Sequence, residues 1–200
     1  MSAAIYINLY KRETFMNNSV TQDSYIIYIQ YYESCLGRLT MAARYGHLIG
    51  LWFENQKYEL QYPGKLSDPI YERKDLPVFE QTALWLDLYF SGQNPKFRPD
   101  ILLEGSAFQK AVWDILLEIP YGQTMSYKQI ADIIARQKGI ARMSAQAVGN
   151  AIGHNPISLI VPCHRVIGSN GKLTGYAGGL FRKQKLLDLE GFGRSDQKES

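Results

Sequence analysis

Residues 155–179, "NPISLIVPCHRVIGSNGKLTGYAGG", form the stretch that decides how the second half of the chain folds and reacts. Its apolar run ends at Pro162, and Cys163 and His164 follow as direct neighbours. A residue before proline favours an extended backbone, and "ISLIV" is short and rich in β-branched residues, so we expect a buried strand over 157–161. A cysteine mounted just beyond a rigid strand has little freedom, which suits a nucleophile.

The thiol of Cys163 needs an activating group. A free cysteine has a pKa of about 8.5, so only a few per cent is thiolate at neutral pH. His164 is the candidate base, but neighbouring side chains on an extended backbone point to opposite sides, so we expect a bridging water between the two. A carboxylate behind the ring would fix its tautomer, and Glu190, near the end of a helix expected over 180–191, is the candidate.

Other kinds of site fit the same pair of residues. Cys163 can instead be a small buried apolar residue, or it can belong to a cysteine hydrolase in which Asn155 completes the site. A metal site is not expected, because Cys35, His47 and His154 are scattered and no Cys-x-x-Cys or His-x-x-x-His spacing accompanies them. No cofactor is expected, and two cysteines in a chain of this size favour free thiols.

Upstream of this stretch the sequence predicts three capped helices. They are expected over 107–120, 127–137 and 145–156. Ser106 and Ser144 can cap the first and the third helix. Ser126, followed by Gln129, forms a capping box ahead of the second helix, and Gly139 ends it. Two successive helices, the second of them short, form a candidate helix-turn-helix, although a tightly packed helix pair without a DNA function has the same pattern.

The helix expected over 145–156 is unusual because small residues cover its faces. They are Ala145, Ala147, Gly149, Ala151 and Gly153. A glycine inside a helix costs about 1 kcal/mol relative to alanine. A short helix that accepts two glycines is therefore expected to gain from the close approach of another group.

The first half of the chain has the pattern of a small sheet. Residues 25–53 are rich in β-branched and aromatic residues and are broken by glycines, which predicts two or three antiparallel strands. Apolar residues at helical spacing over 77–92 predict one amphipathic helix. With the helices of the second half, this makes an α+β chain of two domains, over 25–95 and 106–194, joined by a linker over 96–105.

Charge is distributed unevenly between the two halves. Residues 1–105 carry 10 Lys and Arg against 12 Asp and Glu, and residues 106–200 carry 12 against 7. The basic second half favours a polyanionic partner. No stretch has the ~20 apolar residues of a membrane span and no secretory signal is evident, so a cytoplasmic protein is expected. Residues 1–24 are expected to form a leader, ordered or disordered, and residues 195–200 a short tail.

Several motifs resemble one family when they are taken together and in order. They are "GNAIGHNPIS", "VPCHRVIG", "GKLTGYAGG" and "LLDLEG". Over about 106–192 the chain closely resembles the O6-alkylguanine-DNA alkyltransferases, the methylated-DNA–protein-cysteine methyltransferases. A weaker resemblance in "YYESCLGRLTMAA" and "LIGLWFE" extends to an N-terminal half of the bacterial type, whereas residues 1–24 fall outside it.

This resemblance implies a fold, a partner and an activity. The implied fold is a ribonuclease-H-like N-terminal domain, with a small antiparallel sheet and a helix, followed by a C-terminal domain of winged helix-turn-helix type. The implied partner is double-stranded DNA containing O6-alkylguanine, bound by a monomer through the minor groove. The damaged base is flipped into a pocket, and the alkyl group passes irreversibly from O6-alkylguanine, and also from O4-alkylthymine, to Cys163. Each molecule then acts once.

The same resemblance assigns roles to individual residues. Cys163 resembles the alkyl acceptor, His164 the base that acts through water, and Glu190 the carboxylate that orients this base. Asn155 resembles the asparagine that braces the turn between the DNA-reading helix and the acceptor. The expected base pocket consists of Tyr127, Ser158, Val166, Tyr176 and Ala177. The residues expected to contact DNA are Ala145, Gln146, Ala147, Gly149 and Arg165.

Two positions depart from the family pattern. Gln146 stands where many members have an arginine that fills the gap left by the flipped base, so weaker or differently salt-dependent DNA binding is expected. Ser158 stands where some relatives have proline, which implies a differently walled pocket. Two other functions stay open: a non-enzymatic lesion-binding protein, whose relatives lack the acceptor cysteine, and a transcription regulator built on the same helices.

Overall fold

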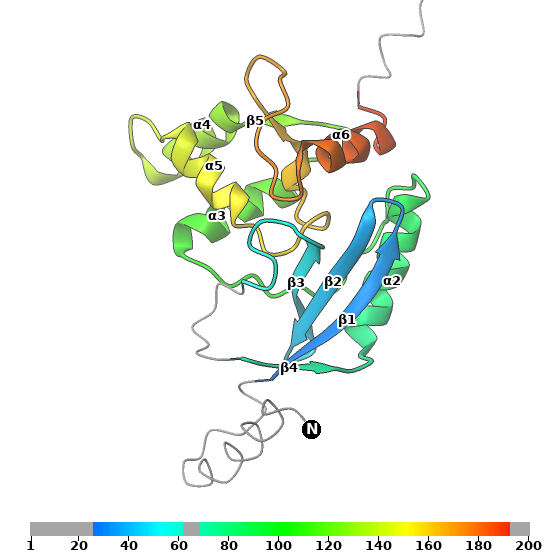
Figure 1. The fold of residues 1–200 in the computed structure, drawn as a ribbon. Helices are drawn as coiled ribbons and strands as arrows, with labels where there is room; N and C mark the ends of the chain where they lie inside the picture. The colour runs from blue at the N-terminus through cyan, green and yellow to red at the C-terminus, as the bar shows by residue number, and fades with distance from the viewer. Residues whose placement is uncertain (1–25, 62–68, 193–200) are drawn as a thin grey trace, which may run out of the picture.

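The structure is a computed structural model of the 200-residue chain, and it describes residues 26–61 and 69–192. The leader expected over 1–24 and the tail expected over 195–200 lie outside the described residues. A small sheet with one helix forms one part of the molecule, and a group of helices and loops sits against one end of this sheet (Figure 1). The chain is therefore α+β, as predicted.

Four strands form the N-terminal sheet in the order β3-β2-β1-β4. Their bounds are Ile26–Ser34 for β1, Gly37–Arg44 for β2, His47–Phe53 for β3 and Ile70–Arg73 for β4. The first three pair antiparallel, which confirms the prediction from their residue pattern. β4 pairs in parallel with β1, and the sequence does not predict it, because its four residues are all exposed and carry no apolar alternation.

One helix, α2 (Pro77–Phe90), covers one face of the sheet, as predicted (Figure 1). Proline at its first position suits a helix start, and Gly92 beyond its end has a φ of 81°, which glycine adopts without strain. The buried side chains of α2 pack into the main core with those of the strands. The largest of them are Phe79, Trp85, Leu86 and Tyr89.

Three helices follow at the predicted places. They are α3 (Ala107–Leu117), α4 (Tyr127–Lys138) and α5 (Ala145–Gly153). Ser106 and Ser126 each complete a capping box, with Gln109 and Gln129 respectively. Gly139 takes the left-handed conformation, at a φ of 64°, and ends α4. Helices α4 and α5 pack against each other and α3 packs against α5, so the candidate helix-turn-helix is a packed pair in the fold.

The remaining elements connect Cys163 to its surroundings. They are β5 (Met125–Ser126), the 3₁₀ helix η2 (Cys163–Arg165), β6 (Val166–Ile167) and α6 (Leu180–Leu189). β5 pairs in parallel with β6, which fastens the start of α4 to the segment after Cys163. α6 packs against η2 and confirms the helix predicted over 180–191.

The strand predicted over 157–161 is wrong. Ile157 forms a bridge with Leu51 of β3, and the residues after it form a turn in which Leu159 has a φ of 70°. The apolar run is buried, as its composition indicates. Its backbone turns because the side chain of Asn155 replaces a neighbouring strand as hydrogen-bond partner: it accepts from Ile157 N and donates to two carbonyl groups of the turn.

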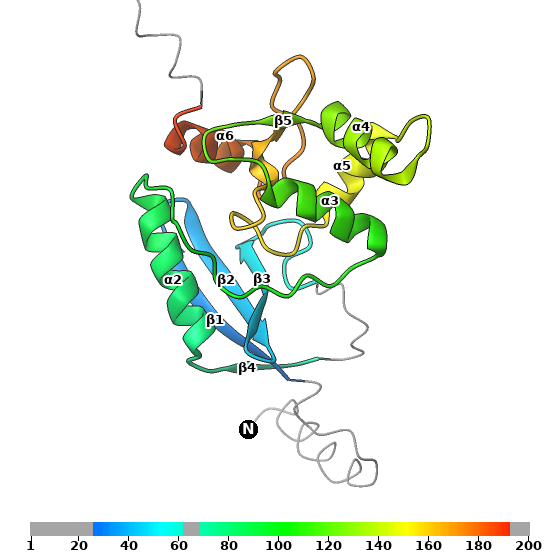
Figure 2. The same ribbon diagram turned by 180° about the vertical axis from the view of Figure 1, so that it is seen from behind.

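The outer edge of β3 is covered by two segments from elsewhere in the chain. Leu48 pairs with Ile101 of the segment between α2 and α3, and Leu51 pairs with Ile157 of the segment before Cys163. Figure 2 shows the chain between α2 and α3 running past β3. Main-chain hydrogen bonds tie both segments to the strand, with Leu51 N donating to a carbonyl on one side of Ile157 and Leu51 O accepting an amide on the other. The N-terminal sheet therefore positions the backbone that carries Cys163.

Candidate active site

Cys163 begins the 3₁₀ helix η2, and only 5% of the residue is exposed. Asn155 Nδ2 donates to Cys163 Sγ over 3.1 Å and to Val161 O over 2.8 Å. Asn155 Oδ1 accepts from Ile157 N at 3.0 Å. Asn155 therefore holds the turn before Cys163 in shape and also donates directly to the sulfur.

Burial raises the pKa of the Cys163 thiol. A hydrogen bond from Asn155, the charge of Lys183 and the backbone amides of Cys163 and His164 oppose this rise without cancelling it. The resting side chain is therefore a thiol at neutral pH, and a base must accept its proton when it reacts.

His164 is fully buried, and its Nε2 lies 2.7 Å from Glu190 Oε1. Burial lowers the pKa of His164, and the charges of Arg165 and Lys183 lower it further, against the raising effect of Glu190. A neutral ring that donates from Nε2 leaves Nδ1 as the atom that can accept a proton. Nδ1 is buried and has no hydrogen-bond partner within the described part of the chain, so Cys163 and His164 do not bond directly.

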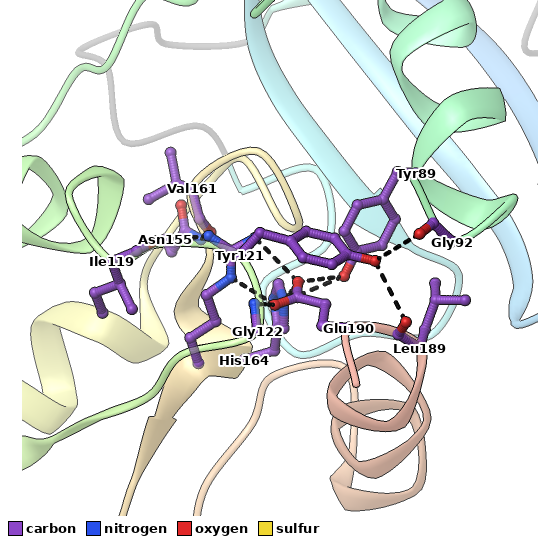
Figure 3. A network of polar contacts seen from close by, with 11 residues as sticks. Tyr89, Gly92, Ile119, Tyr121, Gly122, Asn155, Val161, His164, Leu189 and Glu190 are labelled. Atoms are coloured by element: carbon purple, nitrogen blue, oxygen red, sulfur yellow. Dashed lines mark hydrogen bonds and ion pairs between the residues drawn. The ribbon is translucent and has the colours of Figure 1, made fainter. Parts of the chain in front are cut away.

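Glu190, the residue after α6, is the polar centre of the cluster in Figure 3. Its donors are His164 Nε2 at 2.7 Å, Tyr89 OH at 2.8 Å, Gly122 N at 3.0 Å and Arg165 Nε and Nη2 at 2.9 and 3.0 Å. Burial by itself raises the pKa of Glu190, but the hydrogen bonds from His164 and Arg165 and the charge of Arg165 outweigh it and lower this pKa to about 2. The structure thus places a permanent carboxylate behind His164.

Arg165 does not lie where the predicted DNA contact requires it. Its side chain is buried, forms an ion pair with Glu190 and donates from Nη1 to Ile119 O at 2.6 Å. The guanidinium also lies 5.7 Å from the centre of the Tyr121 ring. Arg165 balances the charge of Glu190 inside the protein, because a buried carboxylate needs a paired cation. This position corrects its assignment to the DNA surface.

Lys183 of α6 is a second buried cation close to the thiol. Its Nζ donates to Val166 O, to Thr174 O at 2.7 Å and to Gly175 O at 3.3 Å. Burial lowers the pKa of Lys183 to about 8, although a charge on Cys163 raises it. Because its partners are carbonyl groups, the ammonium keeps its positive charge near Cys163 and lowers the pKa of the thiol.

Two tyrosines of the expected base pocket stand near Cys163. Burial raises the pKa of Tyr127 and Tyr176, and a charge on Cys163 raises both further. Tyr127 OH donates to Thr174 O at 3.1 Å and to Gly175 O at 3.2 Å. The Tyr176 hydroxyl is buried without a hydrogen bond of ordinary geometry in the described residues, although Ser158 is near enough to lower its pKa.

The other expected pocket residues are held by partners from other parts of the chain. Ser158 Oγ donates to Gln56 Oε1 at 3.1 Å, and Ala177 O accepts from Lys57 N at 3.1 Å. Both partners follow β3, so the loop after this strand supports one wall of the site. Val166 O already accepts from Lys183, which leaves it one lone pair for a ligand.

The exposed face of α5 is hollowed. Ser144, Gln146, Ala147 and Asn150 line an open depression of ≈ 540 Å³. Ser144 caps the helix by accepting from Ala147 N at 3.3 Å, as the sequence predicts. Gln146, Ala147 and the exposed Ala145 therefore lie on a face that a ligand can reach, and Asn150 joins them.

The two glycines of α5 have different surroundings. A Cβ on Gly149 would meet the Tyr127 ring at 3.6 Å, which is an ordinary contact distance. A Cβ on Gly153 would meet no atom of the described residues within 4 Å. Close packing within the described residues therefore does not require a glycine at either position.

Both cysteines are free thiols, Cys35 on the surface and Cys163 buried, as predicted. No group of three or more His, Cys, Asp or Glu residues within 26–61 and 69–192 is arranged to hold a metal ion. No helix in these two ranges is long and apolar enough to cross a membrane.

Family models match most of the described chain. The model for the ribonuclease-like domain of 6-O-methylguanine DNA methyltransferase matches residues 27–102, and the model for its DNA-binding domain matches residues 107–192. A methylated-DNA–protein-cysteine methyltransferase from Mycolicibacterium paratuberculosis is 47% identical over 158 residues, which cover 79% of this chain and 88% of the relative. The chain belongs to the methylated-DNA–protein-cysteine methyltransferase family.

Other members of this methyltransferase family agree in sequence and fold. The Methanosarcina barkeri methylated-DNA–protein-cysteine methyltransferase is 43% identical over 164 residues, covering 82% of this chain and 97% of the relative. The crystal structure of Mycobacterium tuberculosis OGT in complex with DNA has a TM-score of 0.68 and 42% identity, and covers 82% of this chain and 92% of its own. The α+β architecture is thus that of the methyltransferase family.

Two residues close to Cys163 and His164, Lys183 and Tyr89, are not predicted from the sequence. Lys183 carries a usable signal, because it lies three and seven positions before Leu186 and Glu190 and so shares their buried helix face. Tyr89 carries a weaker one. Its spacing from Trp85 places it on the apolar face of α2, but no local pattern indicates that its hydroxyl reaches His164 and Glu190.

Proposed function

We propose that the protein repairs duplex DNA containing O6-alkylguanine by moving the alkyl group irreversibly to its own Cys163. The observation that carries this proposal is the environment of the sulfur: it is buried, it accepts from Asn155, and it is followed by a neutral histidine with a carboxylate behind it. In this proposal His164 is the base and Glu190 orients it. O4-alkylthymine is a second substrate of the same site.

The transfer forms one bond and breaks one. Sulfur attacks the alkyl carbon in line with the carbon–O6 bond, and the electron pair of the broken bond leaves on the guanine. The thiol proton passes through a water to His164 Nδ1, because this is the ring atom that Glu190 leaves free. The departing guanine takes up a proton from water and leaves neutral, and His164 returns the proton it accepted to water, so that no proton is gained or lost overall. The product is a thioether with no proton to lose, so each molecule acts once.

The proposed DNA surface is the exposed face of α5. Its small residues permit close approach to the narrow minor groove, where bulky side chains would clash. The surroundings of Gly149 and Gly153 support this role, since neither glycine is required by packing inside the protein. The target base is flipped toward Tyr127 and Tyr176, at a cost of a few kcal/mol that is smallest for a poorly paired base. Gln146 fills the vacated position, and the protein acts as a monomer.

The test is a transfer assay with duplex DNA that carries radiolabelled O6-methylguanine. We expect one label to become bound to each wild-type molecule and none to bind to Cys163→Ser. Cys35→Ser is the matched control, because it removes the surface thiol and should transfer the label as the wild type does. A duplex with labelled O4-methylthymine tests the second substrate.

Each other outcome contradicts a different part of the proposal. Tight binding of the modified duplex by wild type without transfer would support the lesion-binding alternative. More than one label removed per molecule would contradict a single turnover. Label retained in Cys163→Ser but lost in Cys35→Ser would show that the acceptor has been misassigned.

A further inference from the structure

Tyr89 reaches the His164–Glu190 pair from the N-terminal part of the fold. It is fully buried in the last turn of α2. Its hydroxyl donates to Glu190 Oε1 at 2.8 Å and lies 3.2 Å from His164 Nε2. Since His164 Nε2 is itself 2.7 Å from Glu190 Oε1, the three polar atoms form a closed triangle (Figure 3).

This triangle permits one arrangement of protons. Burial and the charge of Glu190 raise the pKa of Tyr89 well above its usual range, so its hydroxyl keeps its proton and donates to the carboxylate. His164 Nε2 faces the same carboxylate oxygen and therefore carries a proton, because an unprotonated nitrogen there would point its lone pair at a negative charge. The unprotonated nitrogen is then Nδ1, the atom the proposed mechanism uses as base.

Packing holds the hydroxyl of Tyr89 in place. Its ring stacks on Trp85, with ring centres 5.1 Å apart and planes 9° apart. Phe90 and Tyr121 meet the same ring edge-on at 5.6 and 6.1 Å. The His164 ring also lies edge-on, at 6.3 Å. Because rings pack against Tyr89 on several sides, its hydroxyl cannot shift easily. It therefore restricts the position of the Glu190 carboxylate to which it donates.

We propose that Tyr89 is a positioning residue of the transfer centre, through which the N-terminal domain holds the tautomer of His164 and weakens the basicity of Glu190. The inference rests on the proposed function, because it concerns the same histidine. The N-terminal sheet and α2 then contribute a side chain that acts on His164, in addition to supporting the backbone around Cys163.

Removal of the hydroxyl has an effect of known sign. In Tyr89→Phe the carboxylate loses one donor, its charge is less dispersed, and it stabilises a protonated His164 more strongly. The pKa of His164 rises, and the acid limb of the transfer rate moves to higher pH. The plateau rate falls about tenfold, because the imidazole loses part of its orientation.

The experiment compares Tyr89→Phe with Tyr32→Phe across a range of pH. Tyr32 is a matched control because its hydroxyl bonds Asp87 of the same helix at 2.7 Å but does not reach the site. Transfer rate, affinity for modified duplex and the urea midpoint are measured for both variants. We expect the acid limb to shift in Tyr89→Phe alone, with DNA affinity unchanged in both. A slower Tyr89→Phe with the pH profile of wild type would reduce Tyr89 to a packing residue and overturn the inference.

A second measurement does not depend on transfer or on the stability of the variant. Nitrogen-15 NMR of labelled histidine reports the tautomer and titration of His164 directly. We expect wild type to show a protonated Nε2 and an unprotonated Nδ1, and Tyr89→Phe to titrate at higher pH. The reverse tautomer in wild type would overturn the inference. Wild type with the expected tautomer but no alkyl transfer would overturn the proposed function and leave the positioning role intact.

Discussion

The cluster around Glu190 and the exposed face of α5 differ in how completely their polar groups are bonded. The Glu190 carboxylate is buried and accepts from three side chains and one backbone amide. On α5, Gln146 and Asn150 are exposed and border an open hollow. The Glu190 carboxylate has its hydrogen-bond donors in place without a ligand. The polar side chains on α5 are free to bond to a ligand.

This difference separates stability from binding. A buried ionic cluster is costly to break, because the group that loses its partner stays buried without compensation. An exposed polar residue can be exchanged at little cost to folding. We therefore expect changes near Glu190 to alter stability and transfer together, and changes on α5 to alter DNA affinity alone.

The largest effect is expected from Glu190→Gln. The change leaves the guanidinium of Arg165 buried without a counter-charge, which should lower the free energy of unfolding by about 3–5 kcal/mol and slow transfer. Urea denaturation and the transfer assay measure both quantities. Glu33→Gln is the matched control, since Glu33 pairs with Arg38 on the surface and should change stability by less than about 0.5 kcal/mol. Equal losses in the two variants would contradict the contrast between the regions.

Lowering the pH should remove the same contribution in wild type. The pKa of Glu190 is lowered to about 2 from 4.5, so the carboxylate stabilises the fold above pH 4.5 and this contribution is lost as the pH falls toward 2. The shift corresponds to roughly 3 kcal/mol. The gap in urea midpoint between wild type and Glu190→Gln should therefore narrow over this pH range. A gap that stays constant would show that the carboxylate is not held ionised by its partners.

A smaller effect is expected from Lys183→Met. Without the ammonium, the pKa of Cys163 rises, and transfer at pH 7 should slow by up to about tenfold for each unit of that rise, because less of the sulfur is thiolate. Because Lys183 itself has a pKa of about 8, the difference from wild type should shrink above that pH. Lys185→Met, an exposed neighbour on α6, is the matched control. A variant with the pH profile of wild type would remove Lys183 from the activation of the thiol.

The smallest effect is expected from Gln146→Arg. One added phosphate or base contact should strengthen duplex binding a few-fold at low salt and steepen the dependence of log affinity on log salt by about 0.9. Gln137→Arg adds the same charge on α4, beside Asp114 of α3 and Glu118 at the end of that helix, and should change binding less. Titrations at several salt concentrations measure both variants, together with urea midpoints that should match wild type. Unchanged affinity and slope in Gln146→Arg would show that this position does not contact DNA.

The features predictable from the sequence are those whose cause is local. The capping boxes at Ser106 and Ser126 and the glycine after α4 mark helix ends through contacts within a few residues, so the helices are found where the pattern indicates. Glu190 can be anticipated because α6 presents one buried face. The parallel strand β4 cannot, since its pairing with β1 depends on a partner more than 40 residues away in the chain.

The wrong strand at 157–161, the wrong DNA contact of Arg165 and the unpredicted contact of Tyr89 share one cause. In each case a side chain forms hydrogen bonds inside the protein that the backbone or the solvent would normally form. Asn155 binds the backbone of the apolar run and turns it, where a run of β-branched residues alone predicts a strand. Arg165 belongs to the basic half of the chain, which favours a place on the DNA surface, yet its side chain is buried in an ion pair with Glu190. Tyr89 acts across the boundary between the two parts of the fold. Arg165 and Tyr89 meet Glu190 across 25 and 101 residues of the chain, so the local pattern does not reveal these contacts.

The bridge between Leu51 and Ile157 also bears on how the molecule avoids pairing with other chains. β3 is an edge strand, and an uncovered edge is a template for pairing with other chains. The segment that covers this edge leads directly into the tightly packed turn at Cys163. The segment that leads to Cys163 therefore also shields the edge of β3 from pairing with another chain.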